Sequence, residues 1–204
     1  MPVYDKIKDF LRTPGIEGPA QTVGYIPCRP TNYTGHTDPD KYKVFGFSGV
    51  TVATGFDLGQ KTMRELQNEI RLPSDIIEKL APYVGLRGRD AILKLYQNPL
   101  TLSKSEIDAI DDAFIPFYYN RYVKPTYDKE ASVPFESIPD KAQVVIYSIL
   151  YQRGPGYVKW MPVCWGCFVD GDWNGAAYEL MYGLWPDYRL RRKYEGEYLS
   201  GKDK

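Results

Sequence analysis

The spacing of apolar residues predicts a chain that is helical over most of its length. In residues 3–12 apolar side chains recur every three or four positions, as on one face of a short amphipathic helix, and the pair Pro14-Gly15 ends it. Ser103 and Glu106 have the spacing of a capping box, which marks the start of a longer helix. The same reasoning predicts further helices over residues 62–70, 74–84, 89–97, 140–152, 172–182 and 188–199.

A different pattern occupies the chain between the first helix and residue 60. Gly, Pro, Thr, Asn and Asp are frequent in residues 15–47, which predicts loops and short strands. The run SGVTVATGFDLGQ, residues 48–60, alternates β-branched with smaller residues and predicts a β-hairpin. Gly55 and Gly59 within it are expected to permit tight backbone geometry.

These elements predict an α+β fold in a single domain, residues 1–204. A small mixed lobe with a short hairpin sheet is expected at about residues 13–60, with the helix of residues 3–12 leading into it. Residues 61–204 are expected to form a larger, mainly helical lobe. A cleft between two such lobes would suit a polymeric substrate, so we expect the active site there.

Composition excludes several classes of partner. The 204 residues contain 26 Lys and Arg against 26 Asp and Glu, so nothing in the charge indicates a nucleic-acid or anionic-membrane partner. No apolar run approaches the roughly 18 residues of a membrane span, and the first residues lack the apolar segment of a signal peptide. We therefore expect a protein made in the cytoplasm without a signal peptide or membrane span.

Metal and cofactor chemistry is also not indicated. Cys28, Cys164 and Cys167 are the only cysteines and His36 is the only histidine, which argues against a four-ligand zinc site. We expect Cys164 and Cys167 to be buried or incidental, with a disulfide in an oxidising compartment as the alternative. No nucleophile elbow, phosphate loop or dinucleotide fingerprint is present, so no cofactor is expected.

Carboxylates remain as candidate catalysts, and a pair of them can hydrolyse a glycosidic bond. Glu17 follows the first helix, where apolar neighbours such as Ile16 could keep it protonated as a general acid. Asp57 ends the predicted hairpin and could stay charged to activate water. Two simpler interpretations remain open at this point, since Asp57 could cap the next helix and most acids are surface charges.

Several motifs resemble those of a known family. SGVTVATGFDLGQ, preceded by Glu17-Gly18 and by GYIP at residues 24–27, closely resembles the muramidase domain of the pesticin-like toxins and, more distantly, the lysozymes of T-even phages. Those families carry a Glu-Gly after the first helix, then a Thr and an Asp on a hairpin. Towards the end of the chain YQRGPG, DWNGAAYEL, Trp185 and RLRRKYEGEYLSG look like later motifs of that fold, in the same order.

The resemblance implies a lysozyme-like fold and a role for three residues. Glu17 would be the general acid, Asp57 would position or deprotonate water, and Thr51, six positions earlier, would hold that water. Thr54 fits this pattern less well. The stretch between Glu17 and Thr51 is longer than in the relatives, with the excess at residues 29–45, so Asp38 or Asp40 is an alternative carboxylate near the cleft.

Other residues have both a functional and a structural interpretation. Tyr25, Phe56 and Gln152 are candidates for contacts with sugar rings or N-acetyl groups, and each could equally pack in the core. Glu195 lies four positions after Arg191 and three after Arg192, the spacing of an ordinary ion pair on a helix surface.

The resemblance implies a muramidase that cleaves the β-1,4 bond between N-acetylmuramic acid and N-acetylglucosamine in peptidoglycan. It implies an inverting course, which needs carboxyls roughly 6.5–9.5 Å apart, without metal or cofactor. The alternatives are a catalytically silent module that binds glycan or protein, and a glycosidase active on chitin-like polymers. We expect a monomeric antibacterial toxin or effector, or a lytic enzyme, that reaches the periplasm through a holin, a secretion apparatus or a fused toxin domain. An effector would have a cognate immunity protein.

Overall fold

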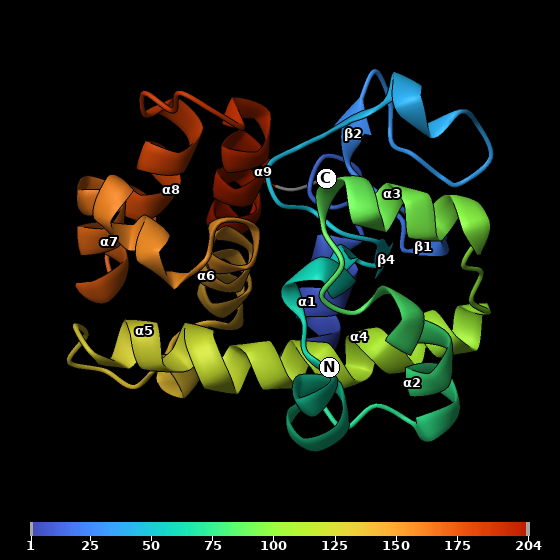
Figure 1. The fold of residues 1–204 in the computed structure, drawn as a ribbon. Helices are drawn as coiled ribbons and strands as arrows, with labels where there is room; N and C mark the ends of the chain where they lie inside the picture. Colours follow the sequence, from blue (N-terminus) through green and yellow to red (C-terminus); the bar gives the residue numbers. More distant parts are fainter. Residues whose placement is uncertain (1, 203–204) are drawn as a thin grey trace. The chain divides into compact units, whose positions relative to one another are not determined.

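The computed structural model describes residues 2–202 and has an α+β fold, as predicted (Figure 1). Helices account for most of the chain and the strands are short. The strands are β1 (Gln21–Tyr25), β2 (Cys28–Arg29), β3 (Lys43–Val44), β4 (Thr51–Ala53) and β5 (Phe56–Asp57). The α-helices are α1 (Val3–Leu11), α2 (Ser74–Leu80), α3 (Gly88–Gln97), α4 (Lys104–Tyr118), α5 (Lys124–Asp128), α6 (Asp140–Arg153), α7 (Pro162–Val169), α8 (Trp173–Tyr182) and α9 (Arg189–Ser200).

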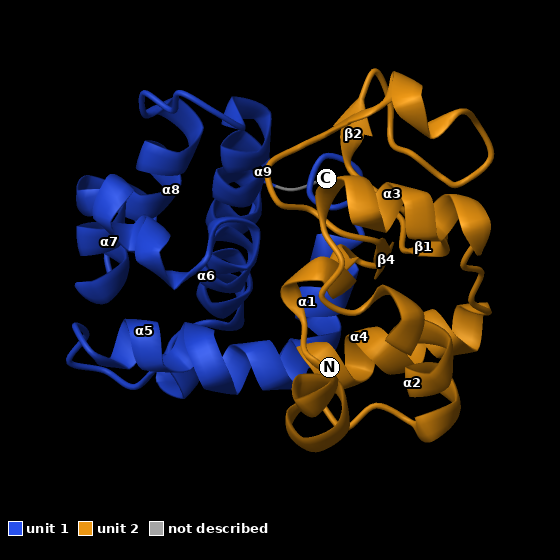
Figure 2. Cartoon of the chain, in the orientation of Figure 1, with its two compact units in different colours: residues 1–18, 115–204 blue, residues 19–114 orange. Residues whose placement is uncertain are grey.

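The chain divides into two compact units (Figure 2). Unit 1 combines residues 1–18 with residues 115–204, and unit 2 is the continuous segment 19–114. Helix α4 contributes its first residues to unit 2 and its last four to unit 1. The division differs from the predicted lobes, because residues 61–114 group with the strands and the first helix groups with the later helices.

Unit 2 contains a three-stranded antiparallel sheet in the order β1-β4-β5 and a two-stranded sheet of β2 and β3. Main-chain hydrogen bonds join the larger sheet to the segment that we expected in the helical lobe. Gly24 N–H donates to the carbonyl of Leu100 at 2.8 Å, and Leu102 N–H donates to the carbonyl of Thr22 at 2.8 Å. These bonds satisfy strand groups that would otherwise need water, which is why residues after 60 belong to the same unit as the hairpin.

Unit 1 is built around α6, in which every residue from Ala142 to Leu150 is buried. This explains its largely apolar sequence, since a helix that is apolar nearly all round must be covered on all sides; Gln143 and Ser148 are the buried polar exceptions. Helix α1 packs against α6 with Ile7, Phe10 and Leu11 buried, and α9 packs against both α6 and α8. Unit 1 thus joins the start of the chain to its last helix.

Most predicted helices are present within one or two residues of their expected ends. The capping box is confirmed, because Ser103 N–H donates to the Glu106 carboxylate at 2.7 Å and Glu106 N–H donates to the Ser103 hydroxyl at 3.2 Å. Helices α5 and α7 were not predicted. Within residues 2–202, no helix combines the length and apolar character that crossing a membrane requires.

The cysteines are all free thiols. Cys164 is buried in α7 and its thiol lies 3.9 Å from the carbonyl of Ala176. Burial raises the pKa of both the Cys164 and the Cys167 thiol, which disfavours the reactive thiolate. The buried or incidental interpretation of this pair therefore fits the structure better than the disulfide.

Candidate active site

Asp57 lies at the end of β5, where its carboxylate is held by two main-chain amides. Its Oδ1 atom accepts hydrogen bonds from Gly49 N–H at 3.0 Å and from Gly59 N–H at 2.8 Å. The second bond caps the short 3-10 helix Leu58–Gln60, so the capping interpretation is confirmed for one carboxylate oxygen. Because both of these hydrogen bonds end on Oδ1, the cap and a catalytic use of Oδ2 are compatible.

The surroundings of Asp57 alter the pKa of its carboxyl group. Burial is the largest influence and raises the pKa of the carboxyl above its ordinary value of 3.8. The two amide hydrogen bonds and the positive charges of Lys61 and Arg87 act in the opposite direction and are weaker. A raised pKa makes a carboxylate a better proton acceptor, as general base catalysis requires.

Gly49 and Gly59, which hold Asp57, pack backbone against backbone. A Cβ atom on Gly49 would lie 2.5 Å from the Cα of Gly59 and 2.4 Å from the carbonyl oxygen of Leu86. A Cβ atom on Gly59 would lie 2.7 Å from that same oxygen. The tight geometry predicted at Gly59 is thus confirmed, and Gly49 shares it.

Gly59→Ala is expected to destabilise the protein by roughly 1–3 kcal/mol, because the new methyl group must displace main-chain atoms rather than a flexible side chain. The same displacement would move an N–H donor of Asp57, so lytic activity should fall together with the melting temperature. Thermal unfolding and wall-lysis assays check this. Gly46→Ala is the control, since a Cβ atom there meets nothing within 4 Å although its φ of 55° adds some strain. Equal effects at both glycines would contradict the packing argument.

Thr51 lies directly beside Asp57 in the sheet. In the antiparallel register Thr51 pairs with Asp57 of β5 on one side and with Tyr25 of β1 on the other. Side chains of directly paired residues share one face of a sheet, with Cβ atoms about 4.5–5.5 Å apart. The three residues Tyr25, Thr51 and Asp57 therefore form one row across the sheet. The Thr51 hydroxyl donates to the carbonyl of Gly49 at 3.3 Å, which orients its lone pairs.

Phe56 occupies the opposite face of the same strand and belongs to the core. It pairs with Val52, is 1% exposed, and meets the ring of Phe114 edge to face with centroids 4.8 Å apart. The Lys61 ammonium lies over both rings, 5.4 Å and 4.8 Å from their centroids. The suggested sugar contact of Phe56 is therefore corrected to a packing role, because strand alternation turns it away from Thr51 and Asp57.

The alternative polar residues of unit 2 have local roles. Thr54 is buried, and both its N–H and its hydroxyl donate to the carboxylate of Asp111 in α4. Asp38 caps a short 3-10 helix by accepting from Asp40 N–H at 3.0 Å, and Asp40 pairs with Arg89. These contacts give Thr54, Asp38 and Asp40 structural roles that require no part in catalysis.

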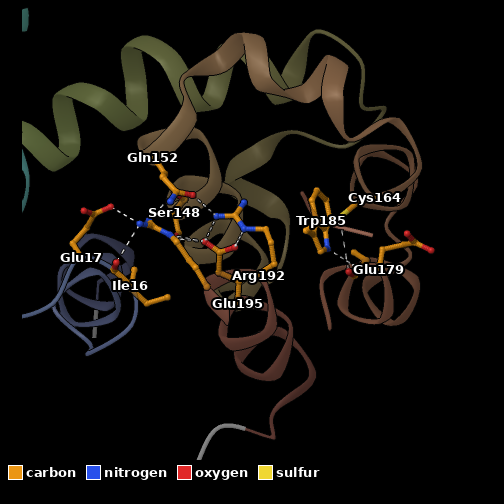
Figure 3. Close-up of polar contacts among 11 residues, drawn as sticks. Ile16, Glu17, Ser148, Gln152, Cys164, Glu179, Trp185, Arg192 and Glu195 are labelled. Atoms are coloured by element: carbon orange, nitrogen blue, oxygen red, sulfur yellow. Dashed lines mark hydrogen bonds and ion pairs between the residues drawn. The ribbon is translucent and has the colours of Figure 1, made fainter. Parts of the chain in front are cut away.

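Glu17, labelled in Figure 3, lies after α1 in unit 1. Arg191 of α9 binds its carboxylate. Arg191 Nη1 donates to Glu17 Oε1 at 2.5 Å and to the carbonyl oxygen of Ile16 at 3.3 Å. The Glu17 side chain keeps 23% of its surface exposed, whereas Arg191 keeps 5%. We expected apolar neighbours such as Ile16 to surround this carboxyl. The contact that fixes it is a charged one instead.

Gln152 of α6 is held by Arg192, which follows Arg191 in α9. Arg192 Nη2 donates to Gln152 Oε1 at 2.7 Å. This hydrogen bond also fixes the direction in which the amide nitrogen of Gln152 points. Both arginines bind Glu195, which is 0% exposed. The prediction that Glu195 forms a surface ion pair is therefore wrong, because α9 turns this face towards α6. Helix spacing alone cannot distinguish a buried pair from an exposed one.

The structure thus groups the predicted site residues into two sets. Tyr25, Thr51 and Asp57 share a sheet face in unit 2, while Glu17 and Gln152 are joined through Arg191 and Arg192 in unit 1. Sequence reasoning missed the role of the two arginines in holding these side chains. In the described part of the chain, no three His, Cys, Asp or Glu side chains gather in a way that could hold a metal ion.

Comparison with known proteins identifies the family of the chain. The profile of the Pesticin family, described as a bacterial toxin homologue of phage lysozyme, C-terminal part, matches residues 6–174. That span includes Glu17, Thr51 and Asp57. No curated protein matches the chain. Because the match covers well over half of the sequence, the chain belongs to the Pesticin family of phage-lysozyme homologues, and its α+β fold is lysozyme-like.

Proposed function

We propose that the protein is a muramidase that hydrolyses the β-1,4 bond between N-acetylmuramic acid and N-acetylglucosamine in peptidoglycan. Glu17 donates a proton to the leaving oxygen, Asp57 accepts a proton from the attacking water, and Thr51 holds that water. Reaction by inversion follows when the second carboxylate activates water rather than attacking the sugar.

One observation carries this proposal, the row of Thr51 and Asp57 in a chain that belongs to a lysozyme-homologue family. A hydroxyl beside a carboxylate whose pKa is raised by burial can bind one water molecule between them and accept its proton. Tyr25 continues the row and offers an aromatic side chain beside the reacting groups, where it can contact a sugar ring.

Purified protein is expected to clear a suspension of peptidoglycan sacculi and to release new reducing ends. Mass spectrometry of the products should find N-acetylmuramic acid at those ends, and proton NMR of the first product should find the anomer opposite to that of the substrate. Equal or faster cleavage of chitin oligomers would assign the site to a chitin-active glycosidase. Glycan binding without any turnover would identify a binding module.

The proposal includes a route to the substrate. Peptidoglycan lies outside the cytoplasmic membrane, so the enzyme would act in the periplasm after delivery by a holin, a secretion apparatus or a fused toxin domain. We favour an antibacterial toxin or effector because of the family's toxin members. Expression targeted to the periplasm should lyse cells, whereas the same protein kept in the cytoplasm should not.

A further inference from the structure

Glu195 is the most thoroughly enclosed charged group in the part of the chain that the structure describes. Its Oε1 accepts hydrogen bonds from Ser148 Oγ at 2.6 Å, Arg192 Nη2 at 3.0 Å and Arg191 Nε at 3.2 Å. Its Oε2 lies 2.8 Å from Arg192 Nε. The side chain is 0% exposed. A buried carboxylate is tolerated only where such partners balance it, so this one is tied to both arginines.

Each arginine carries the connection one step further (Figure 3). Arg191 uses Nη1 to hold Glu17, and Arg192 uses Nη2 to hold Gln152. The Arg191 guanidinium is further fixed by Ser148, whose carbonyl and hydroxyl oxygens accept from Nη2 at 3.2 Å and 3.0 Å. Glu195 therefore binds the two side chains that position two predicted site residues of unit 1.

The charges of this cluster are balanced only when Glu195 is ionised. Two buried arginines face two carboxylates, and Glu17 is the member with appreciable exposure. If Glu195 were neutral, Glu17 would stand before two uncompensated positive charges instead of one. Tyr157 and Cys164 also face Arg192, and Glu179 faces Cys164. A carboxyl group beside more uncompensated positive charge gives up its proton at lower pH.

We propose that Glu195 is a positioning residue for catalysis: it fixes the Arg191 guanidinium that orients Glu17, and its negative charge offsets one of the two arginines of the cluster. This rests on the proposed function in so far as Glu17 is the general acid. An acid must hold its proton until the leaving oxygen takes it, so the high-pH limit of activity reports on this charge balance.

Three variants test the charge balance. Glu195→Gln removes a negative charge, so the alkaline limb of the pH–rate profile should move to lower pH by about one unit. Arg192→Gln removes a positive charge and should move it to higher pH. The double variant restores the charge of the wild-type cluster and should return the limb close to its original position. Glu197→Gln on the same helix is the control, because Glu197 lies outside the cluster and contacts Lys193 at 3.7 Å.

A readout independent of activity follows the carboxyl carbon of Glu17 by ¹³C NMR, with Glu17→Gln identifying its signal. The titration of this signal should move in the same directions in the three variants. The proposal would be overturned if, in folded variants, neither the titration of the Glu17 signal nor the alkaline limb of the pH–rate profile moves. If Glu195→Gln does not fold, Arg192→Gln gives the same test with the opposite sign. Wild-type protein that is inert on peptidoglycan but shows the shifted titrations would refute the proposed function and leave the coupling to Glu195 standing.

Discussion

Asp57→Asn is expected to slow wall lysis by roughly 10²–10⁴, the usual contribution of a general base, while the protein stays folded. Asparagine retains an oxygen that can accept from Gly49 N–H and Gly59 N–H, so the local geometry of the hairpin should persist. What the substitution removes is the negative charge that draws a proton from water. Initial rates of sacculus clearance and far-UV circular dichroism measure the two effects.

The same variant has a defined effect on stability as pH changes. Burial raises the pKa of Asp57 in the folded state above its ordinary value of 3.8. The contribution of this group to stability is therefore fully present at a pH below that ordinary value. That contribution is lost as pH rises through the raised value, because the buried carboxyl must then become charged. The melting temperature of Asp57→Asn relative to wild type should therefore increase from strongly acid to neutral pH.

The control for Asp57 is Asp40→Asn. Asp40 is the alternative carboxylate from the 29–45 segment, and its contact with Arg89 is exposed. This variant should retain near wild-type lysis. A stable and fully active Asp57→Asn would show that the carboxylate serves only as a cap, and loss of activity in Asp40→Asn would move the base to the inserted segment.

Glu17→Gln is expected to reduce the rate by a similar factor of roughly 10²–10⁴, because an amide cannot deliver a proton to the leaving oxygen. The amide oxygen can still accept from Arg191 Nη1, so the side chain should keep its place. Substrate binding should change little, which a co-sedimentation assay with sacculi can measure. The loss should therefore appear in kcat rather than in affinity.

A substrate with a better leaving group separates the acid from other roles. Aryl glycosides need little protonation, so Glu17→Gln should lose less activity on them than on sacculi. An equal loss on both substrates would assign Glu17 to binding or structure. Glu197→Gln serves as the matched control on both substrates.

The sequence predicted those elements whose pattern lies within a short stretch of neighbouring residues. The periodic apolar residues of α1, α3 and α8 and the capping box at Ser103 are each contained in a few neighbouring positions, and they matched the structure. Helix α7 was not predicted, and β1 was covered only by the general expectation of short strands in residues 15–47. The strand lies in a loop-rich segment, and the PVCWGCFV sequence of α7 lacks amphipathic periodicity because apolar residues occupy nearly every position.

The site residues divide in the same way. Thr51 and Asp57 are six positions apart, so a hairpin was enough to predict that they are neighbours. The environment of Glu17 depends on residues 174 positions away in the chain, and that of Glu195 on Ser148, 47 positions away. No local pattern contains such pairs. For this reason the sequence indicated Glu17 as a candidate but predicted neither its contact with Arg191 nor the burial of Glu195.

The discontinuity of unit 1 has a consequence for the order in which a ribosome completes the molecule. Residues 19–114 form a compact unit from one continuous segment, so the hairpin with Asp57 can form once that segment has emerged. Glu17 is synthesised 174 residues before Arg191. At about 5–20 residues per second, it therefore waits on the order of ten seconds or more for its partner. During translation the surroundings of Glu17 are therefore completed only when α9 has been made, and a nascent chain arrested before α9 carries all three candidate catalytic residues without the arginine that holds Glu17.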